Sequence, residues 1–305
     1  MQHTLKKSYT FTGKGLHTGA PVSMTIRPAE AGSGIRFVRT DIGPGATVRA
    51  LATNVGDTSR STALTENGAT VITIEHLMSA ANGLGVDNML VELSAAEVPI
   101  LDGSALPYVQ AITADGLQEQ SAPRKYLALR EPFRYSEEGG ASIEIIPSDE
   151  SEMQLSIDFN SKVLGLQNFK YDAGVDYASQ IAPCRTFCFL HELQFLLSKG
   201  LIKGGDMDNA IVIVEHMPDE ATLQSLKSFF GLESLEVREG YLSNLQLHFP
   251  DEIVRHKMLD MIGDFALLGA PLKGTIIASK TGHRVNTAVC KKLLETNLLY
   301  TIDAN

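Results

Sequence analysis

The residues best suited to chemistry lie late in the chain, where one imidazole and two carboxylates recur at a fixed spacing. His256, Asp260 and Asp264 are each four residues apart, so a helix would stack them on successive turns of one side. Apolar residues at helical spacing accompany this row: Val254, Met258, Met261, Ile262 and Phe265. Because unpaired charges are costly in an apolar setting, the row requires a partner from elsewhere in the chain.

His256 and Asp260 are of the residue types that bind catalytic zinc, which takes three His, Asp or Glu ligands and keeps one position for water. The spacing alone is weak evidence, since charged pairs at i and i+4 also stabilise helices without a metal. Pro250, followed by Asp251 and Glu252, predicts the start of this helix, with the two acids complementing the helix dipole.

Two further histidines have both a chemical and a structural interpretation. Glu75 and His76 open a predicted helix, either as an N-terminal acid beside a core histidine or as a general base beside a third metal ligand. Gly282 precedes His283 and would let the backbone approach closely, and Asp264 could orient this imidazole and raise its pKa. The structural alternative for His283 is a polar loop residue.

Composition excludes several classes of protein. The 305 residues, with a formal net charge of -10, argue against broad nucleic-acid binding, although a local basic pocket for a phosphorylated small molecule remains open. Cys184, Cys188 and Cys290 are too few for a disulfide framework or a structural zinc cluster, so reduced thiols are expected. The sequence contains no apolar run of about 20 residues and no apolar segment after Lys6 and Lys7, so we expect a cytoplasmic protein without a transmembrane segment.

The pattern of elements predicts an α+β fold with two domains of similar size, each a β-sheet layered with helices. Strands followed by helices occur in both halves, and residues 118–125 break the periodicity, so the expected domains are 1–120 and 125–305. The predicted helices cover residues 74–83, 107–114, 187–199 and 286–297, besides the helix that begins after Pro250. Duplication of one unit is an option that no residue-level repeat supports.

Eight short motifs, in order along nearly the whole chain, resemble one family, the zinc-dependent UDP-3-O-acyl-N-acetylglucosamine deacetylases of lipid A biosynthesis in Gram-negative bacteria. They are Gly15-Leu16-His17-Thr18-Gly19, Thr73-Ile74-Glu75-His76-Leu77, Gly83-Leu84-Gly85-Val86-Asp87-Asn88, Pro99-Ile100-Leu101-Asp102-Gly103-Ser104-Ala105, Arg185-Thr186-Phe187, Gly204-Gly205 with Asp208-Asn209-Ala210, Val254-Arg255-His256-Lys257-Met258-Leu259-Asp260, and Ser279-Lys280-Thr281-Gly282-His283. The length resembles that of the stand-alone deacetylase, without a fused dehydratase.

The resemblance implies an active-site cleft between the two domains. It implies that zinc is bound by His76, His256 and Asp260, although iron(II) could replace zinc at such a site. It also implies four catalytic residues, which are Glu75 as general base, Thr186 and protonated His283 as stabilisers of the oxyanion, and Asp264 as the residue that orients His283.

The implied substrate carries UDP, a glucosamine and a long acyl chain. By resemblance, Lys257 would contact phosphate from another side of its helix, and Phe169 and His17 would contact the nucleotide end. Phe187 begins an insert, near 187–214, that would form an apolar passage for the acyl chain. Asp206 departs from the small hydroxyl residue that relatives often have at its position. We expect a monomer; the preferred acyl length does not follow from the sequence.

Two other functions remain open at this point. The first is a zinc amidohydrolase acting on a different nucleotide sugar or acetylated amine, which would keep the metal ligands but not depend on an acyl chain. The second is a two-domain interaction protein in which the histidine and aspartate clusters are purely structural.

Overall fold

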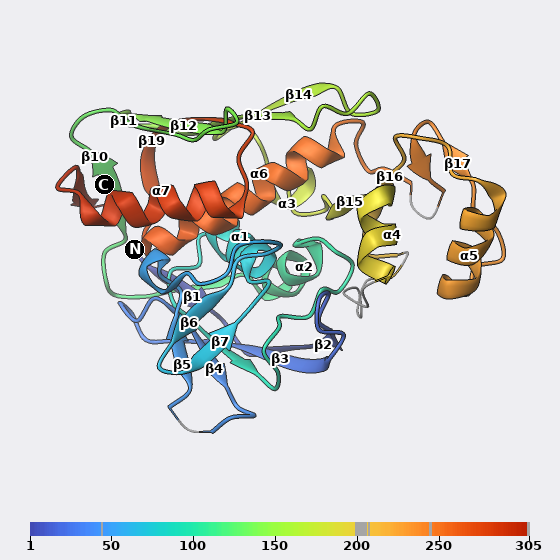
Figure 1. Cartoon of the computed structure of the whole chain (residues 1–305). Coiled ribbons are helices and arrows are strands. Elements are labelled where there is room, and N and C mark those ends of the chain that lie inside the picture. Colours follow the sequence, from blue (N-terminus) through green and yellow to red (C-terminus); the bar gives the residue numbers. More distant parts are fainter. Residues whose placement is uncertain (44, 199–205, 207, 244–245, 304–305) are drawn as a thin grey trace.

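The computed structural model describes residues 1–43, 45–198, 206, 208–243 and 246–303, and it combines α-helices with several β-sheets (Figure 1). The predicted α+β class is therefore confirmed. Two sheets form the outer layers, and helices from both halves of the chain lie between them (Figure 1). No helix in the described ranges has both the length and the apolar character needed to cross a membrane.

The first half forms a five-stranded sheet in the order β2-β3-β8-β4-β5. Its strands are β2 (Tyr9–Lys14), β3 (Pro21–Pro28), β4 (Ile35–Arg39), β5 (Thr47–Arg49) and β8 (Met89–Leu93). On β3, Val22, Met24 and Ile26 are buried while alternate residues are more exposed, as expected for a sheet with one face on the core. Helices α1 (Glu75–Leu84) and α2 (Leu106–Asp115) lie on the inner side of this sheet. Two short two-stranded sheets accompany it, one formed by β1 (His3–Leu5) with β9 (Leu117–Glu119) and one by β6 (Leu64–Glu66) with β7 (Ala69–Val71).

The second half repeats this topology. β11 (Phe133–Ser136), β12 (Ser142–Ile146), β19 (Leu272–Ser279), β13 (Ser151–Asp158) and β14 (Leu166–Tyr171) correspond in pairing to β2, β3, β8, β4 and β5. In both halves the middle strand comes last and pairs antiparallel to one hairpin and parallel to the other. This shared order favours duplication of one unit, while the boundary at 118–125 stays a prediction.

Helices α6 (Glu252–Phe265) and α7 (His283–Glu295) flank β19 in the chain as α1 and α2 flank β8. The second half also contains α3 (Tyr177–Gln180), η2 (Ala266–Leu268) and the strands β10 (Lys125–Leu129) and β20 (Leu299–Asp303), with β10 between β19 and β20 in the sheet. The short helix η1 (Ala52–Asn54) belongs to the first half. α6 packs directly on α1, since a Cβ at Gly263 would lie 2.2 Å from the Glu75 carbonyl oxygen. Only glycine permits this approach, which brings the two helices that carry the candidate ligands together.

The insert was predicted near 187–214, but it is only the first part of a small unit at one end of the molecule, because β18 ends at Leu242 and pairs with β16 (Figure 1). The name insert is used below for this whole unit. Its elements are β15 (Phe187–Phe189), α4 (Leu190–Ser198), β16 (Ile211–Ile213), α5 (Glu220–Phe230), β17 (Val237–Arg238) and β18 (Tyr241–Leu242). It has its own apolar cluster, including Leu190, Val212 and Leu226. The predicted helix over 187–199 was wrong at its start, because Phe187–Phe189 pairs with Ile211–Ile213 as a parallel strand.

Two other local predictions differ from the structure. The last helix begins at His283 rather than at Asn286, so His283 opens a helix and is not a loop residue. A Cβ at Gly282 would meet open space, and the extended backbone there suits any residue, so close backbone approach does not explain this glycine.

Candidate active site

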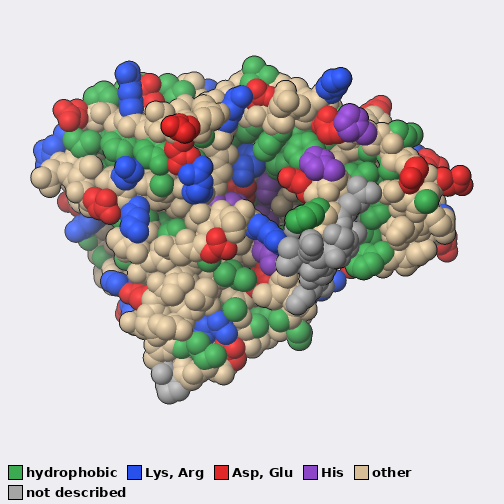
Figure 2. Space-filling model, in the orientation of Figure 1, with side chains coloured by type: hydrophobic (Ala, Val, Ile, Leu, Met, Phe, Trp, Pro, Cys, Tyr) green, Lys and Arg blue, Asp and Glu red, His purple; other side chains and the backbone are tan. Residues whose placement is uncertain are grey.

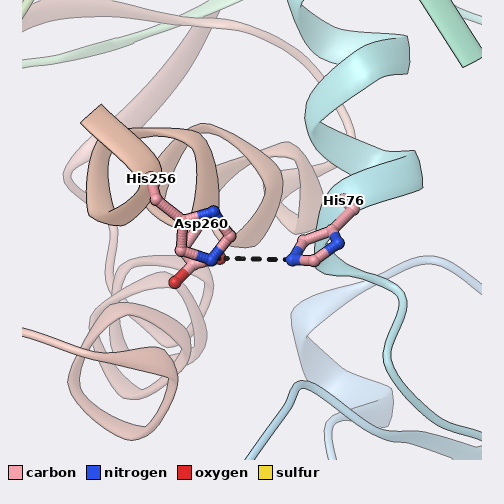
Figure 3. A group of neighbouring side chains, drawn as sticks. All are labelled: His76, His256 and Asp260. Carbon is pink, nitrogen blue, oxygen red and sulfur yellow. Dashed lines mark ion pairs between the residues drawn. The ribbon is translucent and has the colours of Figure 1, made fainter. Parts of the chain in front are cut away.

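Two histidines and one aspartate meet between α1 and α6 (Figure 3). The available ligand atoms of His76, His256 and Asp260 all lie within 4.8 Å of one another, and all three residues are buried. His76 comes from the first turn of α1, whereas the other two residues lie one turn apart on α6. This donor set and spacing are those of a metal site with a position left open for water or substrate.

The hydrogen bonds of these residues suit a bound cation. The Nδ1 atom of His256 lies 3.0 Å from the Cys184 carbonyl oxygen, which fixes Nδ1 as the donor and leaves Nε2 free to bind a metal. Asp260 accepts a hydrogen bond from Lys257 Nζ on Oδ2 at 2.7 Å. Its buried Oδ1 has no hydrogen-bond partner in the described part of the chain. A carboxylate oxygen buried in this way requires a cation or an ordered water.

The protonation states agree with this assignment. Burial lowers the pKa of His76 to about 3, and the neighbouring His256 contributes to the decrease. Burial also lowers the pKa of His256, against the opposing effect of Asp260. Burial alone would raise the pKa of Asp260, but Lys257 and His256 hold it below its usual range. At neutral pH the site therefore offers two neutral imidazoles and one carboxylate, the forms that bind metal.

Glu75 lies beside this group and is also buried. Its Oε2 accepts a hydrogen bond from the Thr62 amide at 3.0 Å, and its Oε1 lies 3.9 Å from His283 Nε2. Burial raises the pKa of Glu75 to about 7, with His283 opposing and Asp260 adding to the increase. A carboxylate with a pKa near neutrality can both take and return a proton at physiological pH.

His283 is oriented by a second buried carboxylate. Asp264 Oδ2 lies 3.0 Å from His283 Nδ1 and accepts a hydrogen bond from Asn286 Nδ2 at 2.9 Å, while Oδ1 accepts one from the Thr62 hydroxyl at 2.6 Å. Burial alone would lower the pKa of His283, but the carboxylates of Asp264, Asp260 and Glu75 raise it to about 9. His283 is therefore protonated at neutral pH and directs Nε2 toward Glu75 and Asp260.

A cavity of about 610 Å³ is lined by Glu75, His76, His256, Asp260 and His283, and Figure 2 shows histidines in a hollow with Lys and Arg side chains around it. The basic residues that line the cavity are Arg60, Lys257, Lys280 and Arg284. Lys280 pairs with Asp158, and Arg284 pairs with Glu137, outside the group of possible metal ligands. Lys257 pairs with Asp260, so among these four basic residues Arg60 is the one without an ion pair in the described part of the chain.

A second cavity of about 630 Å³ adjoins the first and is lined mainly by apolar residues of the insert. Its residues include Cys188, Leu193, Phe195, Val212 and Phe230. Leu16, His17, Arg60, Thr186 and Phe187 line both cavities, so the polar and apolar spaces meet at these side chains.

Most of the predicted substrate-contacting residues border these cavities. His17 and Phe187 line both of them, and Lys257 lines the polar one. Thr186, which was predicted to stabilise the oxyanion, also lines both. The prediction that Lys257 points to another side of its helix was wrong, because its flexible side chain folds back and bonds Asp260. Phe169 lines neither cavity and instead lies under the Arg255 guanidinium, 4.5 Å from the ring centroid.

The insert contains two further sequence predictions. Asp206, which departs from the family pattern, lines the apolar cavity and pairs with Lys14 at 3.3 Å. Gly204 and Gly205 lie outside the described residues.

Several residues that shape the site were not predicted. Thr62 bonds both Glu75 and Asp264, Asn286 bonds Asp264, and the Cys184 carbonyl orients His256. None has a sequence signal, because a threonine, an asparagine and a backbone carbonyl are common everywhere and act here only through tertiary contacts. Arg60 lies before Ser61 and Thr62 in a loop that gave no motif.

Comparison with known proteins gives a consistent result. The family model for UDP-3-O-acyl N-acetylglycosamine deacetylase matches residues 2–226 and 235–295. The chain is 40% identical over 299 residues to the UDP-3-O-acyl-N-acetylglucosamine deacetylase of Teredinibacter turnerae, covering 96% of this chain and 90% of that protein. It is 40% identical to the enzyme of the same name from Myxococcus xanthus, covering 99% and 88%.

The chain also resembles longer proteins. It is 38% identical to the bifunctional enzyme LpxC/FabZ of Bacteroides thetaiotaomicron over 99% of this chain. It spans 66% of the length of that bifunctional relative.

Proposed function

Since the chain belongs to the UDP-3-O-acyl N-acetylglycosamine deacetylase family, we propose that it hydrolyses the N-acetyl group of UDP-3-O-acyl-N-acetylglucosamine and releases acetate, in lipid A biosynthesis. The observation that carries the proposal is the buried group His76, His256 and Asp260 with Glu75 and His283 beside it, at the wall of one cavity. All of these residues come from one chain, so the protein is proposed to act as a monomer on a small molecule.

The metal in this proposal is zinc, with His76, His256 and Asp260 as its ligands. Two imidazoles and one carboxylate suit zinc, and Asp260 Oδ1 is a buried acceptor without a donor in the described ranges. When bound, zinc would supply Lewis acidity that lowers the pKa of water and polarises the acetamide carbonyl. The Cys184 carbonyl, which accepts from His256, and the Lys257 ammonium, which donates to Asp260, would hold these two ligands in place.

Glu75 is the general base of the proposed reaction. Its carboxylate accepts the proton of the attacking water as the water oxygen bonds to the acetyl carbon, and the amide C–N bond then breaks. The Thr62 amide holds Oε2, which supports Oε1 as the atom that faces the reacting water. The proton is available for return to the leaving nitrogen, because the pKa of Glu75 is raised to about 7 by burial.

His283 and Thr186 stabilise the charge that develops on the carbonyl oxygen. Protonated His283 presents Nε2–H near Glu75 and Asp260, and Thr186 contributes a hydroxyl from the cavity wall. Asp264 accepts from Nδ1–H and keeps the imidazole charged and oriented. His283 is also a proton donor for the leaving amine, and the division of this step with Glu75 is a matter for pH-rate measurements.

The two cavities suit the two ends of the proposed substrate. Lys257 and the other basic side chains of the polar cavity would bind the diphosphate of UDP. The apolar cavity would take the acyl chain, with Phe187 and His17 at the junction. Phe169 remains a candidate for the nucleotide end only if the nucleotide extends beyond the polar cavity.

The decisive experiment measures acetate release from UDP-3-O-acyl-N-acetylglucosamine by the purified protein, with and without a chelator. We expect that a chelator removes the activity and that added zinc restores it. Restoration by iron(II) but not by zinc would identify iron as the metal. Comparable turnover of UDP-N-acetylglucosamine without the acyl chain would favour a different amidohydrolase. A metal-loaded protein with no acetate release would refute the proposed reaction.

The role of Glu75 is tested by Glu75→Ala. We expect the variant to fold and to retain the metal while losing activity by about 100-fold or more, because the base is absent. His216→Ala, an exposed histidine outside both cavities, is the control for metal content and turnover. Wild-type turnover by Glu75→Ala would remove this residue from the mechanism.

A further inference from the structure

A buried carboxylate that takes no part in the proposed reaction joins two segments at the border of the active-site cavity. Glu97, after β8, is 1% exposed. Its Oε2 accepts hydrogen bonds from the Thr18 amide at 2.8 Å and the Thr18 hydroxyl at 2.7 Å. Its Oε1 accepts from the His17 amide at 3.0 Å and the Thr73 hydroxyl at 2.9 Å. Four neutral donors from two distant segments thus converge on one charge.

These four hydrogen bonds stabilise the buried carboxylate of Glu97. Among the described residues, no Lys, Arg or His nitrogen forms an ion pair with Glu97. A buried carboxylate without a counter-cation is costly unless its oxygens are fully hydrogen-bonded. The loop around His17 and the turn at Thr73 are therefore both held at Glu97.

The glycine-rich loop is shaped around this carboxylate. A Cβ at Gly15 would lie 2.2 Å from Glu97 Oε2 and 2.5 Å from Thr18 Oγ1. Gly15 is not among the glycines with a positive φ, so the position requires glycine for space and not for its backbone conformation. The loop that contains the motif Gly15-Leu16-His17-Thr18-Gly19 is thus fitted to the side chain of Glu97.

The other segment contains a strained residue next to the catalytic pair. Thr73 has a φ of 60°, which is unfavourable for a β-branched side chain, and it lies two residues before Glu75. Its hydroxyl donates to Glu97, and this bond helps to hold the strained turn. The turn sets where α1 begins and so where Glu75 and His76 lie.

The loop presents an unsatisfied imidazole to the cavities. His17 Nε2 is buried and has no hydrogen-bond partner in the described part of the chain, although the residue lines both cavities. A polar group of a bound ligand would satisfy this atom.

We propose that Glu97 is a positioning residue for substrate binding. Its carboxylate fixes the loop of His17 relative to the turn that precedes Glu75, so a substrate-contacting imidazole keeps one position relative to the catalytic pair. This inference rests on the proposed function for its kinetic readout, and on the hydrogen bonds of Glu97 alone for its structural readout.

The first test is Glu97→Gln, which keeps the size of the side chain but places an NH2 donor against donors from the loop. We expect KM to rise about tenfold, because losing one charge-assisted hydrogen bond changes an equilibrium constant by roughly this factor. The change in kcat should be smaller. Glu92→Gln, an acid-to-amide change in β8 whose carboxylate pairs with Arg27 outside both cavities, is the matched control. An unchanged KM in Glu97→Gln would overturn the proposal.

A double-mutant cycle with His17→Ala tests whether Glu97 acts through His17. If it does, Glu97→Gln adds little to the KM increase already caused by His17→Ala. Fully additive increases would show that Glu97 acts independently of His17 and would contradict the proposed role.

Hydrogen exchange tests the same idea without any substrate. In Glu97→Gln, the amides of 13–19 should exchange faster, while those of β13 keep the wild-type rate. Unchanged exchange of 13–19 would overturn the proposal, as would faster exchange throughout β13, which would mean that Glu97 supports the whole fold. A wild-type protein that releases no acetate would refute the proposed reaction but would leave this exchange result interpretable.

Discussion

Two buried carboxylates on α6, Glu252 and Asp260, differ in how completely the protein hydrogen-bonds their oxygens. Glu252 is fully buried at the start of the helix and accepts hydrogen bonds from the amide, Nε and Nη2 of Arg185 and from the His248 amide. Asp260, two turns further on, accepts from Lys257 on Oδ2 but leaves Oδ1 without a donor among the described residues.

The difference separates a structural charge from a functional one. A carboxylate whose oxygens are all bonded within the protein has no capacity left for a ligand, and its ion pair joins α6 to the segment before β15. A carboxylate with a buried, unpaired oxygen is stabilised only when a cation or water arrives. The sequence correctly predicted Glu252 as an acid in the first turn of this helix. It did not predict the buried ion pair with Arg185.

The largest expected effect comes from Asp260→Asn. Loss of the ligand charge should weaken metal binding and lower kcat/KM by more than about 100-fold, since even changes to residues that only hydrogen-bond a metal ligand cost about 10- to 100-fold. Metal content by elemental analysis and acetate release measure this. Asp219→Asn is the control, because asparagine caps α5 as well as aspartate does. Full metal content in Asp260→Asn would remove this residue from the ligand set.

Glu252→Gln tests the other carboxylate. It leaves the Arg185 guanidinium buried without a counter-charge, so the free energy of unfolding should fall by about 3–5 kcal/mol while one metal per chain is retained. Urea unfolding measures the loss. Glu236→Gln breaks an exposed pair with Arg238 and should change stability by less than about 1 kcal/mol. Equal losses in the two variants would contradict the assignment of Glu252 to a buried structural pair.

A smaller effect is expected from the residue that joins Glu75 to Asp264. Thr62→Val keeps the amide bond to Glu75 but removes the hydroxyl bond to Asp264, which should lower kcat about tenfold with unchanged metal content. Thr62→Ser should restore most of the rate because it restores the hydroxyl. Equal rates in the valine and serine variants would exclude a role for this hydrogen bond.

The smallest effect is a shift in pH dependence. Activity requires ionised Glu75, so kcat/KM should rise with pH through an acid limb at or below about 7, and a bound cation lowers that limb further. It also requires protonated His283, so activity should fall on an alkaline limb at or below about 9. Asp264→Asn removes the nearest carboxylate and should move the alkaline limb down by about one unit. If the alkaline limb stays at the wild-type pH in Asp264→Asn, the ionisation of His283 does not cause that limb.

Local features of the site could be predicted from sequence because they depend on neighbours along the chain. The four-residue spacing of His256, Asp260 and Asp264 requires only a helix, and that helix is present. The strands followed by helices that were expected in both halves are also present. The short strand at Phe187–Phe189 did not, because its pairing partner lies beyond residue 210 and an apolar run alone does not distinguish strand from helix.

By itself, the sequence determined the α+β class, the row of ligands on α6 and, through its motifs, the family. Only the tertiary structure decided which charges are satisfied. It joined Glu75 and His76 to α6 through the close approach at Gly263, and it placed Thr62 between two carboxylates. It also left Asp260 Oδ1 without a hydrogen bond in the described part of the chain, while both oxygens of Glu252 accept hydrogen bonds. The physical reason is that periodicity encodes which face of an element is buried, whereas the partner of a buried charge depends on packing between segments distant in the chain.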